Sequence, residues 1–151
     1  TLSSSSAASD VYKRQAHAGQ TVGIEWASRM NAAGTARRLG MDFSMHSDAP
    51  ITPINPLFTA WCAVQRETAS GRVLGEAERL SVDDALHAIT MGAARTLKLE
   101  RRVGSIEPGK LADFAVLEDD PRAVAPAALK DVKVWGTVLG GRIFPAPGSQ
   151  P

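Results

Sequence analysis

The segment Met41–Leu57 has the sequence MDFSMHSDAPITPINPL, and it indicates the class of fold. Apolar and polar side chains alternate from Met41 to His46, which is the two-residue period of a β-strand. Two prolines follow, and because proline cannot donate to a sheet ladder, the strand is predicted to end near Ser47 or Asp48.

Asp48 is therefore placed at the carboxyl end of a strand, where α/β barrels carry catalytic groups. His46 precedes it by two residues, so the two side chains share a face if the strand reaches Asp48. A carboxylate and an imidazole at such a place can ligate a metal, relay a proton or hold a substrate. Taken alone, the pattern fits plainer roles more often, since an Asp before Ala-Pro commonly forms a turn or caps a helix.

Helical segments are predicted on both sides of this strand. Short helical pieces over Trp26–Leu39 end at Gly40, a typical position for a helix-terminating glycine. After the strand, Asn55 and Pro56 form a favourable helix start, and apolar residues follow at helical spacing as far as Thr68. The order helix, strand, helix indicates an α/β protein.

The second half of the chain changes from helical to β-like patterning. Ser81 is a predicted cap for another helix, with an apolar stripe over Val82–Leu97. Short apolar runs at Ala112–Leu117 and Val132–Leu139 then predict strands, and the Gly140-Gly141 pair predicts a tight hairpin.

Composition sets limits on the class of protein. The chain has 151 residues, of which 44% are hydrophobic, enough for one ordinary domain. Its net charge of +1 gives no reason to expect nucleic acid or an anionic membrane as a partner. Cys62 is the single cysteine, so neither an internal disulfide nor a multi-cysteine zinc site is possible, and we expect a buried, inert thiol.

The stretch FSMHSDAP followed by PINPL resembles the last barrel strand of the metal-dependent amidohydrolases, in particular the YtcJ-like branch, amidohydrolase family 3. The helix LSVDDALHAITMGAARTLKL and the later segments VGSIEPGKLADFAVLEDDP and VKVWGTVLGGRIF resemble the same superfamily. The resemblance implies an α/β fold in which residues 16–100 form the C-terminal end of a (β/α)8 TIM barrel. Residues 101–145 would be part of the flanking β-sandwich, and residues 146–151 a frayed tail.

The resemblance also implies a chemistry, namely hydrolysis of non-peptide, amide-type carbon–nitrogen bonds by a metal-activated water. Asp48 would be both a ligand of the divalent metal, expected to be zinc, and the catalytic group that accepts a proton from the water. His46 would contact the substrate. The implied partner is a small-molecule substrate, with neither nucleic acid nor membrane, and the oligomeric state is left open.

The family builds its metal site from further ligands, including a His-x-His pair, and this sequence lacks that pair. Its three histidines, His17, His46 and His87, are scattered. A catalytic zinc normally has three protein ligands. We therefore expect the parent protein to be the enzyme, this chain to be a C-terminal fragment without activity by itself, and the metal not to be held by the fragment alone.

Two alternative functions stay open at this point. One is a non-catalytic, β-rich binding or interaction module. The other is a deaminase of the same superfamily, which would retain Asp48 and differ in its substrate loops. The compartment is also open, with the cytoplasm as the default expectation, because the native N-terminus is not expected to be part of this sequence.

Residues Thr1–Gln15 differ from the rest in composition. The run SSSSAASDVYKRQ begins as Ser/Ala low complexity, ends polar, and has no apolar core of a secretory signal. It resembles a stretch that arises when sequencing-adaptor sequence is translated at the ends of assembled genes. We predict a non-native segment without fixed structure.

Overall fold

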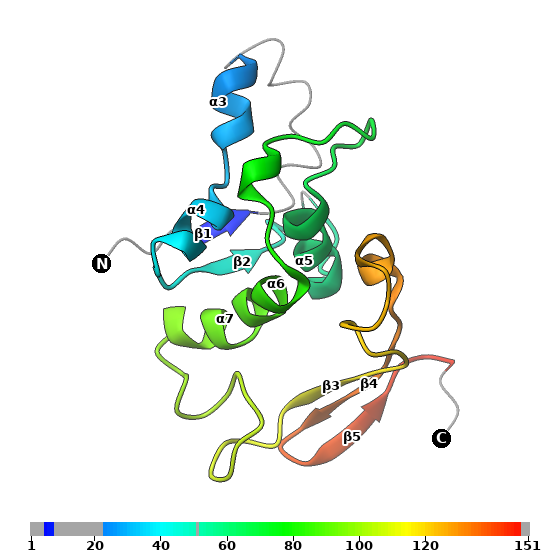
Figure 1. Cartoon of the computed structure of the whole chain (residues 1–151). Helices are drawn as coiled ribbons and strands as arrows, with labels where there is room; N and C mark the ends of the chain where they lie inside the picture. The colour runs from blue at the N-terminus through cyan, green and yellow to red at the C-terminus, as the bar shows by residue number, and fades with distance from the viewer. Residues whose placement is uncertain (1–4, 8–22, 51, 149–151) are drawn as a thin grey trace.

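The computed structural model describes residues 5–7, 23–50 and 52–148 of the chain. Strand β2 (Ser44–His46) lies at the centre of its first part and pairs in parallel with β1 (Ser5–Ala7). Figure 1 shows helices grouped around this pair of strands, and a separate small sheet near the C-terminus. The arrangement is a mixed α/β fold, as the sequence predicted.

The strands are connected and followed by short helices. Between β1 and β2 in the chain lie α3 (Ile24–Arg29) and α4 (Ala33–Arg38). After β2 come α5 (Pro56–Gln65), the 3₁₀ helix η1 (Glu76–Glu78), α6 (Val82–Ile89), α7 (Met91–Thr96) and the 3₁₀ helix η2 (Pro126–Asp131). The small sheet consists of β3 (Phe114–Leu117), β4 (Val134–Leu139) and β5 (Arg142–Pro145). None of the helices in the described residues is long and apolar enough to cross a membrane.

The strand β1 corrects one prediction. Residues 1–15 were expected to have no fixed structure, yet Ser5–Ala7 pair with β2 in the register Ser5 to Ser44. The rest of that segment lies outside the described residues, as does His17. A strand of three residues has no hydrophobic period that a sequence pattern could detect, and the pairing partner supplies its order.

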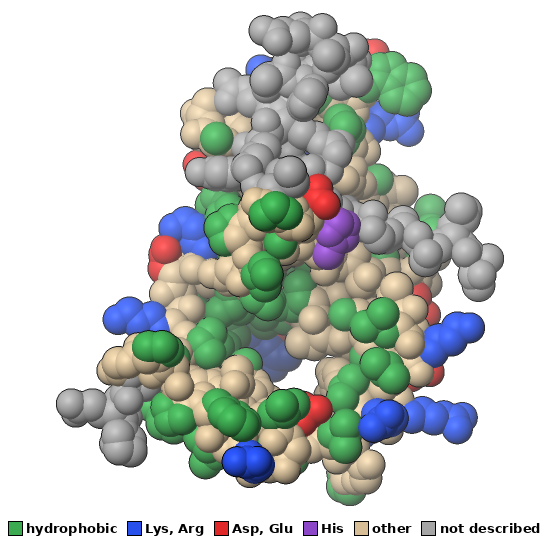
Figure 2. Space-filling model, turned by 180° about the vertical axis from the view of Figure 1, so that it is seen from behind, with side chains coloured by type: hydrophobic (Ala, Val, Ile, Leu, Met, Phe, Trp, Pro, Cys, Tyr) green, Lys and Arg blue, Asp and Glu red, His purple; other side chains and the backbone are tan. Residues whose placement is uncertain are grey.

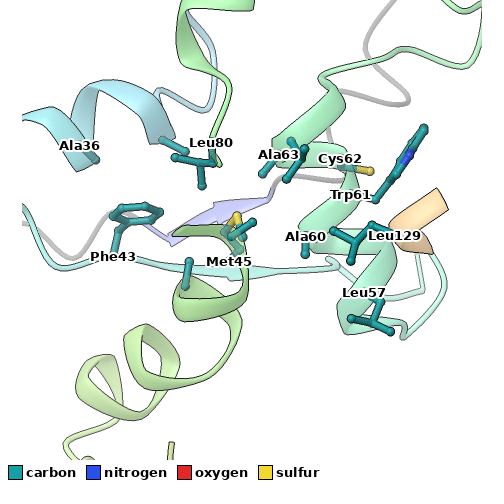
Figure 3. Close-up of a cluster of buried hydrophobic side chains, with 14 of the residues drawn as sticks. Ala36, Phe43, Met45, Leu57, Ala60, Trp61, Cys62, Ala63, Leu80 and Leu129 are labelled. Atoms are coloured by element: carbon teal, nitrogen blue, oxygen red, sulfur yellow. The ribbon is translucent and has the colours of Figure 1, made fainter. Parts of the chain in front are cut away.

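The alternation around β2 places one face of the strand in the core. Phe43 and Met45 are each 7% exposed, whereas His46 on the other face is exposed. Figure 3 shows both apolar side chains among other buried residues, including Ala36 of α4 and Leu80, which precedes α6. The paired strand is shorter than the predicted Met41–His46, because only its last three residues have a described neighbouring strand.

The predicted helix starts are confirmed by their caps. The Asn55 side chain accepts a hydrogen bond from the Phe58 main-chain N–H at 3.0 Å, and Ser81 accepts one from the Asp84 N–H at 3.0 Å. Helix α5 ends at Gln65, before the predicted end, because Arg66 adopts a left-handed conformation with φ 51°.

The predicted helix over Val82–Leu97 is divided in two. The chain leaves helical geometry at Thr90, with φ −116° and ψ −88°, and this separates α6 from α7. Leu97 is consequently 68% exposed, so its assignment to the buried stripe is wrong. Small residues make the close contacts instead, among them Ala85 and Ala88, which are 0% and 1% exposed.

Gly92 provides a test of this close packing. A Cβ built at Gly92 would lie 2.4 Å from the main-chain oxygen of Phe43, nearer than any real Cβ contact allows. We expect Gly92→Ala to lower the free energy of unfolding by about 1–3 kcal/mol, although alanine is the better helix former by about 1 kcal/mol. Urea unfolding followed by circular dichroism measures this change. The neighbouring, half-buried Ala93 is a matched control, and Ala93→Ser should cost less; a stabilised Gly92→Ala variant would contradict the packing argument.

The C-terminal sheet has the antiparallel order β3-β4-β5. The predicted Gly-Gly hairpin is present, since Leu139 pairs with Arg142 across the two glycines. Along the sheet, Phe114, Val138 and Ile143 stand side by side in register. Much apolar surface of this sheet remains accessible, with Ile143 62% exposed. Seen from behind, the molecule has hydrophobic side chains gathered around a hollow (Figure 2).

Candidate active site

Asp48 lies two residues beyond the end of β2, in the turn that leads to α5. Its main chain has a φ of 55°, in the left-handed region that aspartate tolerates better than most residues. The strand itself stops at His46, so the two residues are brought together by this turn and not by the pleat of the strand. The sequence placed Asp48 at a strand end correctly, but the shared strand face was the wrong reason for its proximity to His46.

Two side chains hold the main chain around Asp48. The Asp48 N–H donates a hydrogen bond to Nδ1 of His46 at 3.1 Å. The hydroxyl of Thr52, a residue only 3% exposed, donates to the main-chain oxygen of Ser47. The Ser47 oxygen and the Asp48 N–H belong to one peptide unit, so this unit is held on both sides by side chains, one exposed and one buried, which fixes the direction in which residue 48 leaves the strand.

The carboxylate of Asp48 is accessible and has no ion-pair or hydrogen-bond partner among the described residues. His46 is exposed as well, and within the described ranges it takes part in one hydrogen bond, which it accepts from the Asp48 N–H. A carboxylate held at a strand end without a partner is able to bind a cation or to accept a proton.

The described residues do not include any group of three His, Cys, Asp or Glu side chains that could hold a metal ion. Asp48 is thus a suitable single oxygen donor, but the described part of the chain does not form a complete metal site by the usual count of three protein ligands.

The sequence did not predict a second polar cluster, which is centred on Arg66. Arg66 is 1% exposed, and its guanidinium donates to the main-chain oxygens of Leu74, Asn31 and Met30 at 2.7, 3.0 and 2.9 Å. Burial lowers the pKa of Arg66, and the charge of nearby Glu78 opposes this change. The cluster joins the C-terminal end of α5 to the link between α3 and α4, so its role is to hold these elements together.

A charged cleft of about 500 Å³ lies beside Met41, Asp42 and Phe43, before the start of β2 and away from the Asp48 turn. Three ion pairs line it, formed by Arg37 with Asp84, Arg95 with Asp42, and Arg122 with Asp83. The hydrogen bond from Arg37 holds the pKa of Asp84 below its ordinary value. Each arginine has a carboxylate partner, so the positive charges of the three arginines are balanced by the three aspartates.

Cys62 can be excluded as a nucleophile. Its side chain is fully buried in α5, and burial raises the pKa of the thiol to about 12. The reactive thiolate form is therefore suppressed at neutral pH, in agreement with the prediction of an inert core residue.

Comparison with known proteins shows the family to which the chain belongs. A family model described as "Amidohydrolase family" matches residues 4–145. Bacillus subtilis YtcJ, named as an inferred amidohydrolase, is 39% identical over 100 residues, which are 64% of this chain and 19% of that protein. The N-substituted formamide deformylase of Arthrobacter pascens is 35% identical over 102 residues, covering 68% of this chain and 19% of that enzyme.

A solved structure agrees with these relatives. An uncharacterized metal-dependent hydrolase from Pyrococcus horikoshii superposes with a TM-score of 0.67 and 26% identity, over 79% of this chain and 24% of that one. The chain thus spans about a fifth of the length of the curated relatives it matches.

Proposed function

Because the chain belongs to the amidohydrolase family, we propose that it is the C-terminal part of a metal-dependent hydrolase of amide-type carbon–nitrogen bonds. In this proposal, β2 is the last strand of a TIM barrel, and β3, β4 and β5 form part of a flanking β-sandwich. The relatives are several times longer, so the catalytic site would be completed by segments outside this chain.

The observation that carries the proposal is the state of the Asp48 carboxylate. It stands at the carboxyl end of a strand, in a turn held by His46 and Thr52, and no described residue neutralises it. Leaving a carboxylate unpaired in a well-held turn gives no stability, whereas a catalytic site at that end of a barrel strand requires such a group.

A divalent metal, with zinc as the proposed ion, would be held by Asp48 together with ligands from outside this chain. When bound, it would supply a more acidic water and a polarised substrate carbonyl. The carboxylate is a suitable donor for such an ion.

Asp48 would carry the proton through the reaction. Its carboxylate would accept a proton from the water that attacks the carbonyl carbon, and would later deliver it to the nitrogen that departs as an amine. The balance is one water and one amide consumed, and one carboxylic acid and one amine formed. His46, beside it, would contact the substrate.

Metal removal from a full-length family member that carries this Met41–Leu57 segment tests the proposal. The assay substrate is N-phenethylformamide, an N-substituted formamide like those in the name of the Arthrobacter pascens relative. We expect its hydrolysis to formate and phenethylamine, loss of this turnover after dialysis against a chelator, and recovery on addition of Zn²⁺. Turnover that survives complete metal removal would contradict the proposed chemistry. The 151-residue chain, assayed at the same concentration, should show no turnover, because its described residues provide a single proposed ligand, Asp48.

A further inference from the structure

We propose that the two ring nitrogens of His46 have separate tasks: Nδ1 positions Asp48, and Nε2–H donates a hydrogen bond to an acceptor oxygen of the substrate. The inference rests on the proposed function of Asp48 and adds to it a requirement on the substrate, which must present a carbonyl or carboxylate oxygen to His46.

The hydrogen bond from the main chain determines the tautomer of His46. A backbone N–H can only donate, so the Nδ1 atom that lies 3.1 Å from the Asp48 nitrogen must offer its lone pair. In the neutral ring the single proton is then on Nε2. His46 therefore presents a donor, not an acceptor, on the side of the ring away from the turn.

The Nε2–H has no partner within the described part of the chain. His46 forms no other hydrogen bond, ion pair or ring contact there, and its side chain is exposed on the face of β2 opposite the buried Met45. A donor that stands free beside the proposed catalytic carboxylate is placed to select substrates by an acceptor atom.

The position of Nδ1 explains why this residue would also affect Asp48. Asp48 has a positive φ, a conformation that costs energy and needs support from neighbouring groups. The peptide unit between Ser47 and Asp48 has two supports: the Thr52 hydroxyl binds its oxygen, and His46 accepts a hydrogen bond from its N–H. Losing the His46 bond would loosen the carboxylate without disturbing the core, because the His46 side chain is exposed on the face of β2 opposite the buried Met45.

Two substitutions separate these tasks in a full-length family member with this segment. In His46→Asn, the Oδ1 atom replaces Nδ1 as the acceptor, but nothing reaches the position of Nε2. In His46→Gln, the terminal amide reaches that position, but no acceptor replaces Nδ1. We expect His46→Asn to raise KM about 3- to 10-fold with a small change in kcat, and His46→Gln to lower kcat by a similar factor with a smaller change in KM.

A pair of substrates identifies the acceptor oxygen. N-formylphenylalanine and N-phenethylformamide share a skeleton and differ by one carboxylate. If Nε2–H binds that carboxylate, His46→Asn raises KM for the acid alone; if it binds the scissile carbonyl, KM rises for both. The exposed His87 on α6 is the matched control, and His87→Asn should leave both constants unchanged.

Nitrogen-15 NMR of histidine-labelled protein gives a readout that does not depend on turnover. We expect the His46 signals of a neutral ring with its proton on Nε2. The inference fails if the proton is on Nδ1, or if His46→Asn and His46→Gln both retain the kcat and KM of the parent for both substrates. In that second case a metal-dependent, active parent leaves the proposed function of Asp48 standing, so the two failures are distinguishable.

Discussion

Asp48→Asn in a full-length family member is expected to lower kcat by at least about a thousandfold while leaving the fold unchanged. The amide has nearly the shape of the carboxylate, so the turn beyond β2 is retained. It cannot accept the proton of the attacking water, and it is a much poorer ligand for a divalent cation. Because the Asp48 carboxylate is exposed and forms no described ion pair, its loss removes no stabilising contact.

Stability and turnover should be measured on the same preparation. The melting temperature is expected to stay within a few degrees of the parent, and the initial rate on N-phenethylformamide to fall to the detection limit. Asp42→Asn is the matched control, since Asp42 is an exposed aspartate just before the same strand and pairs with Arg95. It should retain turnover; near-normal turnover in Asp48→Asn would remove Asp48 from the catalytic site.

Arg66→Met is expected to cost about 3–5 kcal/mol of unfolding free energy, the largest effect on stability among the substitutions considered. Methionine fills similar space but makes none of the guanidinium's hydrogen bonds, so the oxygens of Leu74, Asn31 and Met30 would lose their bonds to it. It also leaves Glu78, 8% exposed, without the opposing charge of Arg66.

Urea unfolding of the 151-residue chain measures this loss, and two further variants serve for comparison. Arg66→Lys keeps the charge but offers fewer and differently arranged donors, so its loss should be intermediate. Arg72→Met removes an exposed arginine from the same loop and should change the unfolding free energy by less than about 0.5 kcal/mol. Equal losses for Arg66→Met and Arg72→Met would show that the buried cluster does not hold α5 to the α3–α4 link.

Local patterns predicted much of the fold because their causes are local. The caps at Asn55 and Ser81 use main-chain groups three residues away, so a short window of sequence contains both partners. The same holds for the Gly140-Gly141 hairpin and for the alternation that buries Phe43 and Met45.

Predictions failed where distant segments decide the outcome. The break at Thr90 and the exposure of Leu97 do not follow from an apolar stripe that continues through both helices. Gly92 lies within the predicted helix, but its close contact is with the main chain of Phe43, far earlier in the sequence. The buried state of Arg66 could not be read from the sequence either, since arginine is ordinarily a surface residue.

By itself, the sequence determined that Asp48 follows a half-buried strand and precedes a capped helix, because alternation, prolines and caps act over a few residues. The tertiary structure alone decided which groups Asp48 meets. The left-handed turn at Asp48 brings its N–H to His46 Nδ1, while the buried Thr52 hydroxyl binds the oxygen of Ser47. Such contacts depend on backbone dihedral angles and on burial, which are determined only when β2 packs against its helices. They therefore cannot be predicted from the spacing of residues in the sequence.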